Sequence, residues 1–243
     1  MRALSASELL YAWERAAGLP LAGRSLVLLS VCAADASIDA LARLTIGQRN
    51  ARLLELRVAM FGVQFATVTE CPVCGERVEA TFSADQIRGA DVSLPEICTC
   101  EVADYVVQFR LPNSRDLESL SHITNVDDAR IALIDRLVVC AARHGETVSA
   151  RSFGDEVVIA LGAEMDRLDP NADIRLSFEC PHCTHRFDAG FDIGSFLWAE
   201  LDAWAARILG EVHELASVYG WSEHDILEMS AVRRQAYLHL IAQ

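Results

Sequence analysis

The sequence lacks the motifs by which the common enzyme classes are identified. It has no glycine-rich phosphate loop, no G-x-S-x-G segment and no H-E-x-x-H pair, because His213-Glu214 is not followed by a second histidine. Cys140 and His144 have the spacing of neighbours on a helix and could form a thiolate–imidazole pair, but no third orienting group is evident. A familiar catalytic centre is therefore not indicated, and we expect a protein that is not an enzyme.

Positive charge and long apolar runs are also scarce. The formal net charge is −14 over 243 residues, and such a surface repels nucleic-acid backbones and anionic lipids. The longest apolar run, residues 26–34, is too short to cross a bilayer. The charged residues Glu8, Glu14 and Arg15 before it disfavour a signal peptide. We expect a cytoplasmic protein that binds neither nucleic acid nor membrane.

A duplicated Cys-Pro-x-Cys segment is the strongest positive signal. The copies are E-C-P-V-C-G-E-R-V-E-A-T-F, residues 70–82, and E-C-P-H-C-T-H-R-F-D-A-G-F, residues 179–191. A Cys-x-x-Cys turn lets both sulfurs reach one ion, and two such turns make the closed four-thiolate shell of structural zinc. Each turn is followed by alternating residues typical of a return strand, which predicts a hairpin. We therefore predict one structural zinc per chain, bound by Cys71, Cys74, Cys180 and Cys183.

The two copies stand unusually far apart. Zinc-ribbon pairs are commonly separated by about 15–20 residues, whereas here the gap runs from Gly75 to Glu179, so a whole block is inserted between the halves of the site. A redox role for either pair would need a βαβ setting, which neither has. Thr184 replaces Gly75 in the second copy and should weaken its turn. His182 and His185 flank that turn, and we interpret both as bystanders because four thiols complete the shell.

The other cysteines are less informative. Cys98 and Cys100 could be an extra thiolate pair or a regulatory pair, although partly buried free thiols are the simpler interpretation. Cys32 and Cys140 lie in apolar runs and are expected in the core. Eight cysteines, mostly in metal-binding spacing, fit a reducing compartment better than a disulfide framework.

The hydrophobic pattern predicts an α+β fold that is mainly helical. Its zinc-ribbon-like four-cysteine element is formed by two distant hairpins with helices before, between and after them. Helices are expected within residues 5–17, 26–31, 37–44, 45–61, from 113 on, 131–143, 157–168, 195–219, from 222 on, and 232–241; strands are expected within 63–69, 105–111 and 174–178. No linker rich in proline, glycine or serine is present, so residues 1–62 (helical), 63–194 (split zinc ribbon with an inserted helical block) and 195–243 (helical) are expected to interlock as one domain.

The carboxyl-terminal segment suggests a docking surface. Ser195 is expected to cap a long amphipathic helix that Gly220 ends. Most of its apolar stripe should be core, but three tryptophans in one acidic tail are unusual. The candidate partner-binding residues are Trp198, Trp204, Tyr219, Trp221, Arg233 and Arg234. The arginines of residues 43–57, like the Arg233-Arg234 pair, are expected to be solvated or to form salt bridges.

Several of these segments also resemble a known family. The string E-V-H-E-L-A-S-V-Y-G-W-S-E-H-D-I-L, residues 211–227, leads into Arg233-Arg234 and Tyr237-Leu238. Further shared pieces are Y-A-W-E-R (11–15), I-G-Q-R-N-A-R (46–52), L-P-N-S-R-D (111–116), Asp169-Pro170 and the two C-P-x-C turns. Together they resemble the baseplate hub assembly proteins (chaperones) of the T-even phage type, which are encoded with phage tails and phage-tail-like contractile injection systems.

The resemblance implies a non-enzymatic assembly chaperone or adaptor that acts on the baseplate or its hub in the bacterial cytoplasm. Its partners would be baseplate or hub proteins. A permanent structural component of the baseplate is the first alternative. A zinc-ribbon protein associated with nucleic acid or transcription is a second, against the charge argument, and a thiol redox protein is a third.

Overall fold

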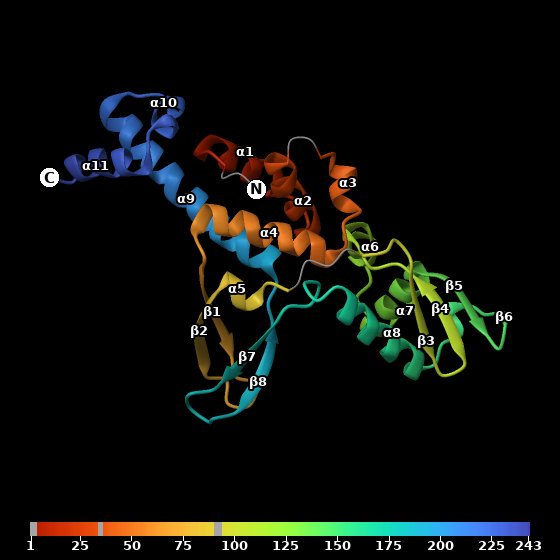
Figure 1. Ribbon diagram of the computed structural model, residues 1–243. Helices are drawn as coiled ribbons and strands as arrows, with labels where there is room; N and C mark the ends of the chain where they lie inside the picture. The colour runs from red at the N-terminus through yellow and green to blue at the C-terminus, as the bar shows by residue number, and fades with distance from the viewer. Residues whose placement is uncertain (1–3, 34–35, 90–93) are drawn as a thin grey trace.

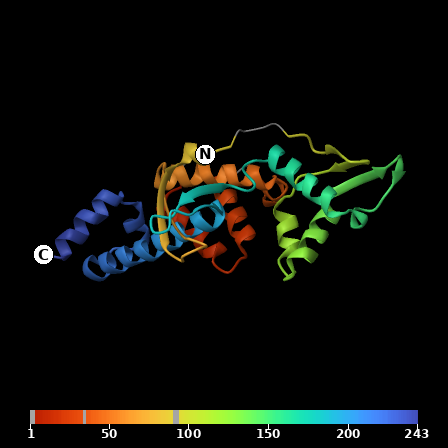
Figure 2. The same ribbon diagram turned by 90° about the horizontal axis from the view of Figure 1, so that it is seen from below.

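The molecule is elongated, with the amino-terminal helices and the two hairpins in its middle, between the carboxyl-terminal helices and the inserted block (Figure 1). The computed structural model describes residues 4–33, 36–89 and 94–243; Ala34, which ends the longest apolar run, lies outside them. The predicted class is confirmed, because the chain is a mainly helical α+β protein with two cysteine-bearing hairpins. The carboxyl-terminal helices and the block inserted between the hairpins lie at opposite ends (Figure 2).

The amino-terminal helices are set by their caps. They are α1 (Ala6–Ala16), α2 (Leu21–Cys32), α3 (Ile38–Ala42) and α4 (Ile46–Phe61). Ser5 and Thr45 form capping boxes at α1 and α4, each side chain accepting from a backbone N–H of the first turn. Gly62 ends α4 with a φ of 87°, a conformation that favours glycine. The sequence-based prediction of these helices is confirmed.

Two antiparallel hairpins carry the cysteine turns. The first joins β1 (Gln64–Glu70) to β2 (Arg77–Ser83), followed by α5 (Ala84–Ile87); the second joins β7 (Arg175–Glu179) to β8 (Arg186–Gly190). Each is its own two-stranded sheet. A small apolar cluster that includes Val78 and Phe178 packs the hairpins together beside the cysteines. An isolated two-stranded hairpin is only marginally stable in water. The stability of the two hairpins therefore depends on the contacts between them.

The block between the hairpins, which we call the insert (residues 94–168), contains more sheet than predicted. Its elements are β3 (Cys98–Val102), β4 (Tyr105–Phe109), α6 (Ser114–Leu120), α7 (Val126–Leu137), β5 (Val138–Arg143), β6 (Glu146–Thr147), η1 (Ala150–Ser152) and α8 (Asp155–Leu168). The strands form one antiparallel sheet in the order β3-β4-β5-β6. The predicted helix over 131–143 is wrong beyond Leu137, because Val138 to Arg143 pair with β4 instead.

The carboxyl-terminal segment is helical, as predicted. It contains α9 (Ile193–Tyr219), α10 (Glu223–Glu228) and α11 (Ala231–Ile241). Asp192, not Ser195, caps α9, because the Asp192 side chain accepts from the Ser195 backbone N–H. Ser222 caps α10, and Gly220 ends α9 in the left-handed conformation.

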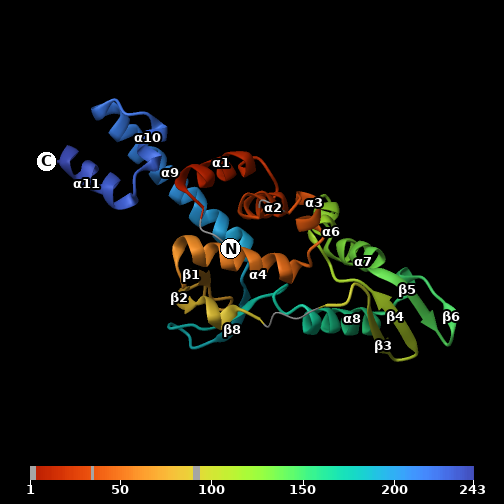
Figure 3. The ribbon, with the colours of Figure 1, turned by 45° about the horizontal axis from the view of Figure 1, so that its top comes forward.

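Three hydrophobic clusters account for most of the packing. The largest takes residues from α1, α2, α4, both hairpins and the first half of α9, so all three predicted segments contribute to it. We call the elements that share this cluster the body. A second cluster joins the end of α9 to α1, α10 and α11. The third lies between α8 and the sheet of the insert. Figure 3 shows the insert beside the body, with α6 near α3.

Candidate metal centre and polar junction

The two cysteine turns have the same backbone geometry. In the first, Cys71 N–H donates to the Glu76 carbonyl and Gly75 N–H to the Cys71 carbonyl, each at 2.9 Å. In the second, Cys180 and Thr184 make the equivalent bonds at the same distances. The last position of each turn is left-handed, with a φ of 74° at Gly75 and 57° at Thr184. The repeat in sequence is therefore a repeat in structure.

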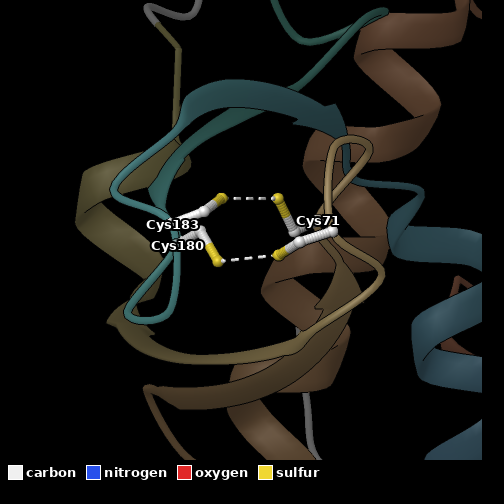
Figure 4. Close-up of side chains that lie close together, drawn as sticks. Cys71, Cys180 and Cys183 are labelled. Carbon is white, nitrogen blue, oxygen red and sulfur yellow. Dashed lines mark hydrogen bonds between the residues drawn. The ribbon is translucent and has the colours of Figure 1, made fainter.

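The fold brings the four predicted cysteine ligands together. The sulfur atoms of Cys71, Cys74, Cys180 and Cys183 all lie within 4.8 Å of one another. Cys71 and Cys183 are 3.7 Å apart, and Cys74 and Cys180 are 3.6 Å apart. A tetrahedral zinc with Zn–S bonds of about 2.3 Å requires sulfur–sulfur edges of about 3.8 Å. Figure 4 shows Cys71, Cys180 and Cys183 with their side chains pointing toward one another from the two turns. The donor set and its spacing therefore fit a four-thiolate zinc site.

Proton affinity at this cluster differs between neighbouring thiols. Burial acts to raise the pKa of Cys71, but the backbone N–H groups of Cys74 and Val73 and the adjacent thiols outweigh it and lower this pKa to about 7. The Glu76 backbone acts to lower the pKa of Cys74, but burial and the three neighbouring thiols raise it to about 12. Four thiolates cannot gather without a cation to neutralise them, and a divalent metal supplies that charge.

The histidines beside the second turn lie outside the cluster. Among the described residues, the four cysteines form the one group of cysteine, histidine or acidic side chains with metal-binding spacing. The His185 ring instead stacks on Phe187 at a centroid distance of 6.1 Å. His182 and His185 are thus not among the residues that the fold brings to the sulfurs.

Of the remaining cysteines, Cys140 departs from the prediction, whereas Cys98 and Cys100 are the buried and partly buried thiols expected. Cys98 is buried and Cys100 half-buried against the core of the insert, and burial raises the pKa of both thiols. Such thiols are unreactive. Cys140 is exposed on β5 and Cys32 is half-buried, so the expectation that both lie in the core is wrong for Cys140.

The Cys140–His144 pair is not a helical pair. Cys140 lies on a strand, and His144 occupies the turn after it with a φ of 52°. The His144 Nε2 atom lies 2.9 Å from Asp104, on the neighbouring turn. The i, i+4 spacing brings two side chains together only on a helix. Because Cys140 lies on a strand, this candidate pair is excluded.

The candidate partner-binding residues divide into two groups. Trp198 and Trp204 are half-buried against the core of the body, and the Arg24 guanidinium lies 4.5 Å above the Trp198 ring. Tyr219 and Trp221 stack at 4.5 Å and meet Tyr237 at the carboxyl-terminal end.

The two neighbouring arginines of this set differ. Arg233 is exposed and lies over the Tyr237 ring at 5.8 Å. Arg234 is buried, and its Nε atom pairs with Glu211 at 3.1 Å, joining α11 to α9. The placement of Arg234 on a partner surface is therefore corrected, whereas the expectation that it forms a salt bridge is confirmed.

A buried polar junction, unpredicted from the sequence, joins the first turn of α4 to the insert and its return segment. The Ile46 N–H donates to the Pro112 carbonyl at 3.0 Å, and the Gly47 N–H donates to Asp169 Oδ2 at 2.9 Å. The first N–H groups of a helix have no acceptor within the helix. In α4, two of these N–H groups find acceptors in distant segments of the chain. A Cβ atom on Gly47 would lie 1.8 Å from Asp169 Oδ1, so any larger residue would have to displace the Asp169 carboxylate.

The next turn of α4 extends this junction. Asn50 Nδ2 donates to the Asn171 carbonyl at 2.9 Å, while Arg49 donates to Asn50 Oδ1 and to Ser114 Oγ. Burial lowers the pKa of the Arg49 guanidinium, and the field of Asp192 offsets this only in part. The segments 46–52, 111–116 and 169–170 thus meet in space. All three segments are among those that resemble the baseplate family, and the junction gives them a structural role.

A comparison with protein-family models matches residues 26–198 to the family described as T4 bacteriophage base plate protein. The matched range includes both hairpins, the insert and the first turns of α9. Searches of curated proteins and of solved structures found no match. None of the described helices combines the length and apolarity that crossing a membrane requires.

Proposed function

Because the chain belongs to the T4 bacteriophage base plate protein family, we propose that it is a non-enzymatic assembly factor for the baseplate or hub of a phage-tail-like contractile injection system. The family match over residues 26–198 carries this proposal, since it covers the cysteine hairpins and the insert together. The partners are then other baseplate or hub proteins. The protein acts before or during assembly, in the cytoplasm of the producing cell.

The cysteine cluster has a structural role in this proposal. Cys71 and Cys180 are buried and only Cys74 is exposed, so the turns leave little room for a substrate at the metal. A closed four-thiolate shell has no open coordination position for chemistry. The zinc therefore ties two hairpins that would be marginal alone, and partner contacts are made by other surfaces.

We place the principal partner contact at the carboxyl-terminal end. Tyr219 and Trp221 are partly exposed there and both contact Tyr237, over whose ring Arg233 lies. On α11, Val232 is 82% exposed and Leu240 is 58% exposed. Aromatic residues and arginine contribute strongly to protein interfaces, and this end of the chain lies beyond the family match.

Quantitative mass spectrometry of purified particles tests the assembly role against its alternative, a permanent structural component. An assembly factor should be absent or far below stoichiometric level in mature particles, and deletion of its gene should abolish complete baseplates. Stoichiometric presence in mature particles would overturn the transient role and support the structural component. Normal particle yield after deletion would overturn both.

A second experiment tests the carboxyl-terminal contact. Val232→Asp and Leu240→Asp should each lower the yield of complete particles when they complement the deletion, without lowering the melting temperature. Val126→Asp is the matched control, because Val126 is 80% exposed but lies on the insert. Equal yields from all three variants would contradict the assignment of this surface.

A further inference from the structure

The insert and the body have separate hydrophobic cores. The cluster between α8 and the sheet consists of described residues from Leu94 to Leu168, and the main cluster of the body contains none of them. The chain passes between the two parts twice, before Leu94 and after Leu168. Figures 1 and 3 show the insert extending away from the hairpins and α4. Two separate cores predict that each part keeps its fold when the contact between them opens.

Polar contacts join the insert, together with its return segment (residues 169–171), to the body, and α6 also lies beside α2. Besides the bonds from Ile46 and Gly47, the polar contacts include Asn50 with Asn171, Gly89 N–H with Asn171 Oδ1 at 2.7 Å, and the exposed pair of Arg115 with Asp39 at 2.8 Å. Opening such an interface exposes groups that water can satisfy, so each hydrogen bond adds little to the cost of separation. Opening an apolar core has no such compensation.

The hydrogen bonding of the first turn of α4 depends on whether the contact between the insert and the body is closed. When it is closed, Pro112 and Asp169 accept from the first two N–H groups of α4, and the Asp169 carboxylate stands at the positive end of the helix. When it opens, α4 retains only its Thr45 cap. Docking of the insert and order in the first turn of α4 are therefore coupled.

We propose that this junction is a reversible latch. The insert is an arm that swings away from the body as a folded unit and returns to a position fixed by Asp169 against Gly47. Small polar interfaces between separately folded parts permit such motion. This latch depends on the junction and the two separate cores, and it holds whichever baseplate role the protein has.

Hydrogen exchange on the unmodified, metal-loaded chain tests the latch. The N–H groups of Ile46, Gly47 and Gly89, which bond across the junction, should exchange at least tenfold faster than buried amides of α8 and of the middle of α4. Exchange of all these amides at one common rate would overturn the proposal, because the junction would then open only when the whole molecule unfolds.

A pair of glycine variants sharpens the test. Gly47→Ala pushes Asp169 away and should speed exchange at the junction at least a further tenfold, while the core of the insert stays protected and the maximum dimension from X-ray scattering increases. Gly162→Ala is the control, because Gly162 lies on α8 with open space around its Cβ position. It should leave junction exchange and dimensions unchanged.

A milder variant protects the test against misfolding. Asp169→Asn keeps the shape of the side chain and loses its charge, so it should speed exchange at the same amides by a smaller factor. Loss of protection in the core of the insert together with the junction, in either Gly47→Ala or Asp169→Asn, would overturn the proposal of an independently folded arm.

Discussion

At the scale of single residues, the two cysteine turns differ at one strained position. Gly75 and Thr184 both have a left-handed backbone, which a β-branched residue adopts at a cost of about 1–2 kcal/mol. Thr184→Gly should therefore stabilise the protein by about 1 kcal/mol, less the chain entropy that glycine loses on folding. Thermal unfolding with metal bound measures this.

The converse change provides the control for that prediction. Gly75→Ala should destabilise the first turn, although space is open around its Cβ position, because the strain is in the backbone. If Thr184→Gly lowers the melting temperature instead, the hydrogen bond from Thr184 Oγ1 to the Cys183 carbonyl outweighs the strain.

Another residue-scale prediction concerns Asp116, whose side chain is only 1% exposed. Burial acts to raise the pKa of this carboxyl, but hydrogen bonds from Arg110, Arg136 and the Asn113 backbone outweigh burial and lower it. A lowered carboxyl pKa gives stability above the unfolded value of about 3.9, and this stability is lost as the pH falls through the folded value. Asp116→Asn should cost about 3 kcal/mol at neutral pH.

Urea unfolding at pH 7 and at pH 3.5 measures both effects. The wild type should lose more stability between these two pH values than Asp116→Asn, because the variant has no carboxyl to protonate at that site. Asp135→Asn is the control: its pair with Arg151 is exposed on the insert, and such pairs contribute at most about 1 kcal/mol. Similar losses in the two variants would show that burial of the Asp116 cluster adds nothing.

At the scale of elements, Arg57 joins α4, β1 and α9. Its guanidinium forms a two-pronged pair with Glu200 at 2.8 and 2.7 Å, donates to the Gly62 and Gln64 carbonyls at 2.6 Å each, and lies 3.8 Å from the Phe65 ring centre. Lysine has the charge without the planar fork. Arg57→Lys should therefore lose about 1.5–3 kcal/mol, the scale of hydrogen bonds to a charged group.

An exposed arginine–glutamate pair provides the control for the loss of stability expected in Arg57→Lys. Arg88 and Glu55 are 50% and 37% exposed in their side chains, so Arg88→Lys should change the free energy of unfolding by less than about 1 kcal/mol. Denaturant unfolding of both variants gives the comparison. A loss in Arg57→Lys no larger than in Arg88→Lys would contradict the structural role of Arg57.

Among the helices and strands, those with clear local signals can be predicted from the sequence, and those that depend on distant pairing cannot. Helices with clear caps, such as α4 between Thr45 and Gly62, follow from local signals and were predicted closely. The segment 131–143 was misassigned because its apolar residues suit a helix or a strand, and only pairing with β4 decides for a strand after Leu137. β3 was missed because its alternation is short and its pairing partner is β4.

The candidate site divides in the same way. The clustering of Cys71, Cys74, Cys180 and Cys183 could be predicted because a repeated short motif carries the metal-binding spacing locally. The junction could not, because Gly47, Asp169 and Asn171 bond over sequence separations such as the 122 residues between Gly47 and Asp169. No local pattern reports that a distant carboxylate lies against a glycine, and Arg234 was assigned to a partner surface because its salt-bridge partner Glu211 lies on another helix.

At the scale of the whole molecule, a metal ion bound by the four clustered cysteines would join two segments that otherwise share a small apolar cluster. Val78 and Phe178 pack beside the sulfurs, but two-stranded hairpins have little stability of their own. Metal binding to a site absent from the unfolded chain adds directly to the free energy of folding. We therefore expect one zinc per purified chain, and a large drop in melting temperature when a strong chelator removes it.

Two cysteine variants separate this effect from general loss of a thiol. Cys71→Ser removes a buried ligand and should abolish stoichiometric zinc and lower the melting temperature, whereas Cys140→Ser, an exposed thiol outside the cluster, should change neither. Because Cys74 has a pKa raised to about 12 without metal, zinc must displace protons to bind, so its apparent affinity should fall as the pH falls. Zinc at well under half an equivalent, together with a titratable disulfide, would instead support the redox alternative. A Cys71→Ser variant that melts at the wild-type temperature would mean that the body holds both hairpins without the metal.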